Sequence, residues 1–130
     1  MTDGVEPAFL LDTNILVYLI EGTSDTLRGN VERHAPGSLA TSTLCAAEAM
    51  FGIRGNDRAS AMLSQLLTLI TPLPFDIAAA ERFAGVPFRR AKLDRFIAAH
   101  TLALGLTLVT NNESDFIDVA GLRIENWVKA

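Results

Sequence analysis

The chain has 130 residues, a length that suits one compact domain with a single hydrophobic core, so we expect one domain over residues 1–130. Hydrophobic residues make up 49% of the sequence, which excludes a disordered protein. The net charge of −4 argues mildly against a phosphate-rich partner, unless the acids gather in one place. The longest apolar stretch, residues 97–109, is too short and interrupted to cross a membrane, and no secretory signal is visible. With a single cysteine, Cys45, these features predict a cytoplasmic protein.

Short apolar runs alternate along the chain with longer segments of helical period. The run at residues 8–12 is continuous rather than alternating, which is typical of a strand buried on both faces of a parallel sheet. Ser24 or Asp25, Ser42 or Thr43, and Asp76 are candidate helix N-caps, and Gly105 is a candidate helix end. The predicted strands are residues 8–12, a short strand after a turn within 36–41, residues 106–110, and a last, edge strand at 123–128, while residues 71–75 are expected to be extended. The predicted helices are 13–22, 24–34, 42–52, a segment around 62–70, one from Asp76, and 91–104.

This alternation predicts an α/β fold in which helices cover both faces of a parallel sheet. Functional groups in such folds gather at the carboxyl ends of the strands. Asp12 ends the first strand and Thr110 ends a later one, followed by Asn112 and Asp115. If the two strands run parallel, these side chains lie at one edge of the sheet.

Four carboxylates are candidate site residues, although each has a local structural explanation. Asp12 could cap the helix that follows it, and Asp94 suits the positive end of its own helix dipole. Asp115 could belong to a helix start at Asn112 or to a solvated turn. Glu48 is expected on the buried face of its helix, where it needs a cation, a proton or an arginine partner. The residues predicted to share that face are Leu44, Ala47, Glu48 and Phe51.

Together the four acids suggest a metal site, because converging carboxylates repel one another unless a divalent cation lies between them. Oxygen ligands without histidine or cysteine favour Mg²⁺ or Mn²⁺. The sequence holds 15 acidic and 11 basic residues, so without the four candidates the two numbers are equal. The net acidity is therefore compatible with a phosphate substrate.

With these residues in view, the chain resembles the PIN-domain ribonucleases, most closely the VapC-type toxins of bacterial toxin–antitoxin pairs. The resemblance runs from about Phe9 to Trp127. It is carried by LLDTNILVYLI around Asp12, by AAEAMFG around Glu48, and by LDRFIAAHTLALGLTLVTNNESDF, which holds Asp94 and Asp115. It implies a PIN-like three-layer sandwich with a central, mostly parallel sheet of 4–5 strands flanked by helices.

The resemblance implies a metal-dependent endoribonuclease that hydrolyses phosphodiester bonds in structured, tRNA-like RNA with a Mg²⁺-activated water. Asp12, Asp94 and Asp115 would hold Mg²⁺ or Mn²⁺, with Glu48 binding the metal directly or through water. Thr110, Asn112 and Asn14 would orient ligands or water around it. The implied partners are a VapB-like antitoxin and a second copy of the chain.

A run of basic residues, Arg89, Arg90, Lys92 and Arg95, surrounds Asp94 and departs from the shorter approach of many relatives. Such a run is either a solvated helix start or a set of cations that steers phosphate, and Arg89 and Arg90 are the candidate substrate contacts. His100 follows the apolar stripe of its helix and is interpreted as a packed core residue.

Three other interpretations are weaker. A haloacid-dehalogenase-like phosphotransferase needs a second aspartate where Asn14 stands, and a receiver domain needs a lysine after a late strand, where LVTNN has none. A PIN-fold module that binds RNA or a partner without cleaving it is the stronger alternative. Four intact acids argue against it, and a metal titration would distinguish the two.

Overall fold

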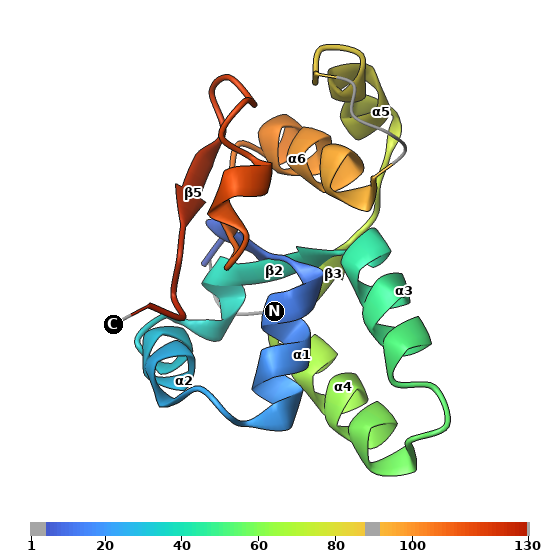
Figure 1. Cartoon of the computed structure of the whole chain (residues 1–130), viewed down its shortest axis with the longest axis vertical. Coiled ribbons are helices and arrows are strands. Elements are labelled where there is room, and N and C mark those ends of the chain that lie inside the picture. Colours follow the sequence, from blue (N-terminus) through green and yellow to red (C-terminus); the bar gives the residue numbers. More distant parts are fainter. Residues whose placement is uncertain (1–4, 88–91, 130) are drawn as a thin grey trace.

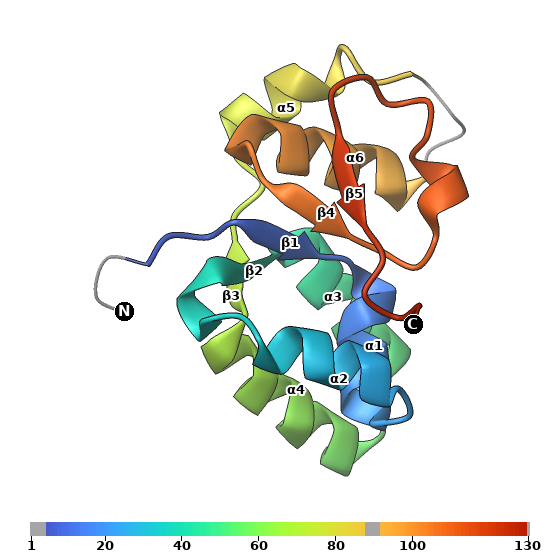
Figure 2. The same cartoon turned by 90° about the vertical axis from the view of Figure 1, so that its left-hand side faces the viewer.

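The computed structural model describes residues 5–87 and 92–129, which form a three-layer α/β sandwich (Figure 1). Helices α5 and α6 cover one face of the central sheet, and α1 to α4 lie on the other side (Figures 1 and 2). The elements in chain order are β1 Phe9–Leu11, α1 Thr13–Glu21, α2 Asp25–Glu32, the 3₁₀ turn η1 Pro36–Ser38, β2 Leu39–Ser42, α3 Thr43–Gly52, α4 Asp57–Leu69, β3 Thr71–Leu73, α5 Ile77–Phe83, α6 Leu93–Leu104, β4 Thr107–Val109, the 3₁₀ turn η2 Glu113–Asp115, and β5 Arg123–Glu125.

The five strands form one sheet in the order β3-β2-β1-β4-β5, and every pair is parallel. Leu11 is in register with Thr41 of β2 and with Val109 of β4. After β1 the chain builds outward through β2 and β3, then returns to add β4 and β5 on the other side. The switch point between β1 and β4 is where parallel α/β sheets bind their ligands, beyond the carboxyl ends of the strands.

Helix boundaries follow local side-chain chemistry. Ser24 and Asp76 accept hydrogen bonds from the N–H groups of Leu27 and Ala79, so both are the N-caps expected from the sequence. Ser42 caps α3 in the same way, through the N–H of Leu44. Gly105 ends α6 with a φ of 69°, a left-handed conformation that favours glycine.

The core lies on both faces of the short strands. Leu10, Leu11, Leu108 and Val109 are fully buried, which agrees with the expectation for continuous apolar strands in a parallel sheet. Beyond β5 the C-terminal segment runs back toward α2 (Figure 1). There Trp127 stacks on His34 at a centroid distance of 4.5 Å.

The predicted α/β class, the sandwich and the parallel sheet are confirmed, and β5 is the expected edge strand. Within residues 5–87 and 92–129, no helix has both the length and the apolar character needed to span a bilayer. Arg89 and Arg90 lie outside the described residues.

Candidate metal centre at the sheet edge

Asp12 lies at the end of β1 and caps α1. Its Oδ1 accepts a hydrogen bond from the N–H of Ile15 at 3.2 Å, and its own N–H donates to the carbonyl of Val109 at 3.1 Å. The side chain is therefore fixed at the switch point by both the strand and the helix. The local explanation for Asp12, that of a helix cap, is correct, but it does not account for burial to 6% exposure.

The surroundings of Asp12 disfavour its charge. Burial raises the pKa of this carboxyl to about 6, while hydrogen bonds from Thr110 and Ile15 act in the opposite direction. The negative charges of Glu48 and Asp94 raise the pKa further. All three carboxylates are thus close enough to interact, and a cation between them would reverse the penalty.

A hollow of about 110 Å³ lies beside Asp12. Its lining residues come from the start of α1, from α3, from α6 and from the segment after β4: Asp12, Thr13, Asn14, Glu48, Leu93, Asp94, Ile97, Asn112 and Phe116. The volume holds a cation with a few waters, since one water occupies about 30 Å³ in the liquid. Thr13 adds a buried hydroxyl oxygen with no hydrogen bond among the described residues.

Glu48 reaches this hollow from a different helix face than the sequence indicated. The predicted buried face was wrong, because Glu48 and Ala47 are exposed and Phe51 is 65% exposed. The buried residues of α3 are Cys45, Ala46 and Ala49. Alanines lie on both sides of α3, so its apolar stripe is weak. Its small buried residues pack inward, and Glu48 remains in solvent at the rim of the hollow.

Asp94 lies half-buried in the first turn of α6, where the helix dipole favours a negative charge. Its neighbour Arg95 is only 2% exposed, so both interpretations of the basic run, solvated surface and phosphate steering, are wrong for this residue. Nη1 of Arg95 donates to both carboxylate oxygens of Asp118 at 3.2 Å, and Nη2 donates to the carbonyl of Asp115. Arg95 therefore ties α6 to the segment after β4.

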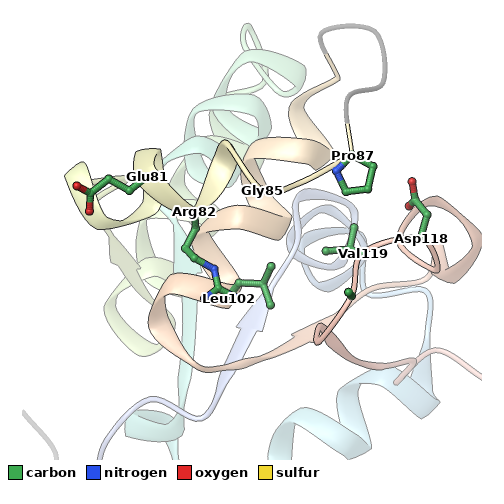
Figure 3. Close-up of a pocket in the computed structure, with 8 residues that line it drawn as sticks. Glu81, Arg82, Gly85, Pro87, Leu102, Asp118 and Val119 are labelled. Atoms are coloured by element: carbon green, nitrogen blue, oxygen red, sulfur yellow. The ribbon is translucent and has the colours of Figure 1, made fainter.

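Figure 3 shows the outer side of this connection. In this view Asp118 and Pro87 stand next to each other at a second pocket of about 270 Å³. The carbonyl oxygen of Pro87 lies 3.5 Å from Nη1 of Arg95. That pocket shares no lining residue with the hollow beside Asp12. No sequence pattern predicts the Arg95–Asp118 pair, because the two residues are 23 positions apart.

The segment after β4 brings Asn112 to the hollow, whereas Asp115 is exposed and is not among the residues that line it. Asn112 precedes η2, as expected of a helix start, but its side chain makes no capping hydrogen bond. The Thr110 hydroxyl hydrogen-bonds to Asp12 and accepts a bond from the N–H of Asn112 at 3.0 Å. Thr110 thus connects the first acid to this segment.

Within the described part of the chain, no three carboxylate, histidine or cysteine side chains stand close enough to form a ready-made metal site. Mutual repulsion explains the spacing, because side chains of like charge separate when nothing neutralises them. The oxygen donors fit Mg²⁺ or Mn²⁺ in kind, and small side-chain movements are needed to complete the coordination. His100 is buried and hydrogen-bonded to Ser42 at 2.9 Å, as expected of a core histidine.

A family model for the PIN domain matches residues 9–122. The chain belongs to the PIN-domain family. It is 31% identical over 130 residues to Ribonuclease VapC2 of Haemophilus influenzae, covering 92% of this chain and 98% of that protein. It is 30% identical to the tRNA(fMet)-specific endonuclease VapC of Shigella flexneri, covering 92% and 97%. This PIN domain is therefore of the VapC type, as the resemblance indicated.

The structure of VapBC2 from Rickettsia felis, bound to a promoter DNA fragment, contains a similar fold. The TM-score is 0.83 at 27% identity, and the match covers 92% of this chain and 98% of that one. VapBC from Salmonella typhimurium, also bound to DNA, gives a TM-score of 0.82 at 26% identity. The shared fold extends over nearly the whole PIN domain.

Proposed function

We propose that this PIN domain is a metal-dependent endoribonuclease that acts as the toxin of a toxin–antitoxin pair. The observation that carries the proposal is the grouping of Asp12, Glu48 and Asp94 around one hollow at the sheet switch point. Relatives of the same length are named ribonucleases, which agrees with phosphodiester hydrolysis as the chemistry.

Asp12, Asp94 and Glu48 would hold Mg²⁺ or Mn²⁺, and Asp115 would join them only after a movement of η2. When bound, the cation supplies an acidified water and neutralises charge on the phosphate. No lysine, histidine or cysteine is among the described residues that line the hollow, so a carboxylate is the available proton acceptor.

The protein residues hold this arrangement in place. The Ile15 N–H and the Thr110 hydroxyl fix the orientation of Asp12, and Arg95 fixes the chain after β4 against the helix that carries Asp94. Asn14 and Asn112 line the hollow as neutral groups that can orient water or substrate. Of the three acids that line the hollow, Glu48 is the exposed one, so its side chain has the most room to move.

The proposed substrate is structured, tRNA-like RNA, in line with the tRNA(fMet)-specific endonuclease VapC of Shigella flexneri. The proposed protein partners are a VapB-like antitoxin, as in the VapBC complexes of similar fold, and a second copy of the chain.

The deciding experiment is cleavage of a mixed tRNA pool by antitoxin-free protein, with Mg²⁺, with Mn²⁺ and with EDTA. Asp94→Asn should lower cleavage by more than about 100-fold, beyond the 10–100-fold typical of residues that only support a metal ligand. Asp57→Asn is the matched control, because Asp57 also lies in the first turn of a helix but does not line the hollow.

A Mn²⁺ titration distinguishes the enzyme from the binding-module alternative. The nuclease should bind Mn²⁺ in the wild type and weakly in Asp94→Asn. A folded protein that binds RNA but neither binds Mn²⁺ nor cleaves would refute the nuclease and favour a binding module.

A further inference from the structure

A pocket of about 420 Å³ is lined in part by the segment after β4, which also lines the hollow beside Asp12. It is formed by the second half of α1, the connection to α2, the chain after β4 and the C-terminal segment. Its lining residues are Tyr18, Thr23, Ser24, Asp25, Thr26, Asn111 and Val128.

Two pairs of residues connect this pocket with the hollow. Asn14 lines the hollow and Tyr18 lines the pocket, and on α1 they are four residues apart, so their Cβ atoms lie one helical turn, about 5–6 Å, from each other. Asn112 lines the hollow and its chain neighbour Asn111 lines the pocket. A ligand that extends from the hollow by about one nucleotide therefore meets this pocket first.

The orientation of the Asn111 amide follows from its neighbours. Oδ1 of Asn126 accepts hydrogen bonds from the N–H groups of Val128 and Lys129, at 2.9 and 3.3 Å. Nδ2 of Asn126 must then be the group that faces Asn111, and it donates to Oδ1 of Asn111 at 3.1 Å. The NH₂ group of Asn111 is left as a donor without a partner among the described residues, beside the pocket that the residue lines.

The chemistry of the lining suits a neutral, polar ligand better than a phosphate. No lysine or arginine is among the described residues of the lining, and Asp25, the charged residue among them, is already paired with Arg28. The amide donor of Asn111 can read a base edge, the Tyr18 ring can contact a base, and the threonine hydroxyls can hydrogen-bond to a ribose 2′-OH. A base and ribose next to a phosphate held at the hollow have these properties.

We propose that this pocket binds the base and ribose of the nucleotide that adjoins the phosphate at the hollow, and that Asn111 reads the base. The inference rests on the proposed nuclease function, because it takes the hollow as the phosphate site. On this inference, the residues that determine which base is preferred beside the cut are different from the acidic residues of the hollow.

The test compares cut sites in a randomised RNA, read by sequencing the fragment ends. Asn111→Asp keeps Oδ1 for Asn126 and replaces the NH₂ donor with an acceptor, so the base preference at one position beside the cut should change by roughly tenfold. Tyr18→Leu removes the aromatic ring without a change of charge and should weaken the preference at the same position. Asn56→Asp is the control, because it makes the same change at the N-cap of α4 and should leave the preference as in the wild type.

Nucleoside titration followed by NMR separates this inference from the proposed function. Uncharged nucleosides should shift the Asn111 side-chain NH₂ and the amides of residues 23–26 in the wild type, and less so in Asn111→Asp. Such shifts in a protein that cleaves no RNA would refute the nuclease and support the pocket. The inference is overturned if Asn111→Asp leaves the cut-site preference unchanged and nucleosides cause no NMR shifts. It is also overturned if Asn111→Asp changes only the inhibition by the antitoxin, because the pocket would then be a protein contact.

Discussion

Asp12→Asn should stabilise the metal-free protein at neutral pH, although it removes a candidate catalytic group. The buried carboxylate of Asp12 is charged at pH 7.5, close to Glu48 and Asp94 and without a cation. An asparagine has nearly the same shape and keeps an oxygen that can cap α1 through the Ile15 N–H. The substitution therefore removes the unfavourable charge and leaves the helix cap in place.

The pKa of Asp12 sets the size of the effect. The folded protein raises this pKa from 3.8 to about 6, and each pH unit corresponds to about 1.4 kcal/mol, so the ionised side chain costs about 3 kcal/mol of folding free energy. The amide also disturbs the hydrogen bond with Thr110, at a cost of about 1 kcal/mol. The expected net gain is about 2 kcal/mol at pH 7.5.

The sign of the effect gives it a characteristic pH dependence. Below pH 4 both folded and unfolded chains hold the proton and the wild type carries no penalty. The wild type loses this stability as the pH rises from about 4 to about 6, and the penalty is complete above that range. The advantage of Asp12→Asn should therefore be absent near pH 4 and full at pH 7.5.

Urea unfolding in EDTA at pH 4, 5 and 7.5 measures this difference as a shift in the transition midpoint without a change in slope. Asp76→Asn is the matched control, because Asp76 caps α5 through the Ala79 N–H at 3.1 Å but is exposed. It should change stability by less than about 0.5 kcal/mol at each pH. A loss of stability in Asp12→Asn at pH 7.5, or a difference that is constant with pH, would show that Asp12 is not an uncompensated buried charge.

Two further predictions concern the same edge of the sheet. Mn²⁺ affinity, measured by calorimetry, should rise with pH through about 6, because the proton on Asp12 must leave before the cation binds, and a pH-independent affinity would contradict this. Arg95→Met should destabilise the fold by about 2–3 kcal/mol in urea unfolding, because it removes the hydrogen bonds of a buried guanidinium to the Asp118 carboxylate and the Asp115 carbonyl, whereas Asp118→Asn, at a side chain that is 24% exposed, should cost about 1 kcal/mol. Equal losses from the two variants would mean that the Asp115 carbonyl contributes nothing to the clamp.

The features that could be predicted from the sequence are those set by local chemistry. Continuous apolar runs around Leu10 and Leu108 indicated buried parallel strands, and side-chain caps such as Ser24 and Asp76 marked helix starts. The alternation of these elements then placed Asp12 and Thr110 at one sheet edge, which the pairing of β1 with β4 confirms.

Features that depend on long-range packing could not be predicted in the same way. The face that α3 buries is decided by how closely its alanines approach α1, so Glu48 was placed on the wrong side of the helix although it does reach the hollow. Arg95 looked like part of a solvated basic run, because its partner Asp118 lies in a segment that only the fold brings beside α6. A hydrophobic pattern contains no information on such a pair.

The acids at the sheet edge differ in how firmly they are held, and this difference has a consequence for metal binding. The side chain of Asp12 is held by the helix cap and by Thr110, whereas only the backbone of Asp94 is placed, by the first turn of α6. Glu48 is exposed, so its side chain loses conformational freedom when it closes on the cation. The charges of Glu48 and Asp94 disfavour the charge of Asp12 in the free protein, and a divalent cation at the proposed site would remove that penalty. On the proposed function, the penalty on Asp12 would therefore add to the affinity for the cation.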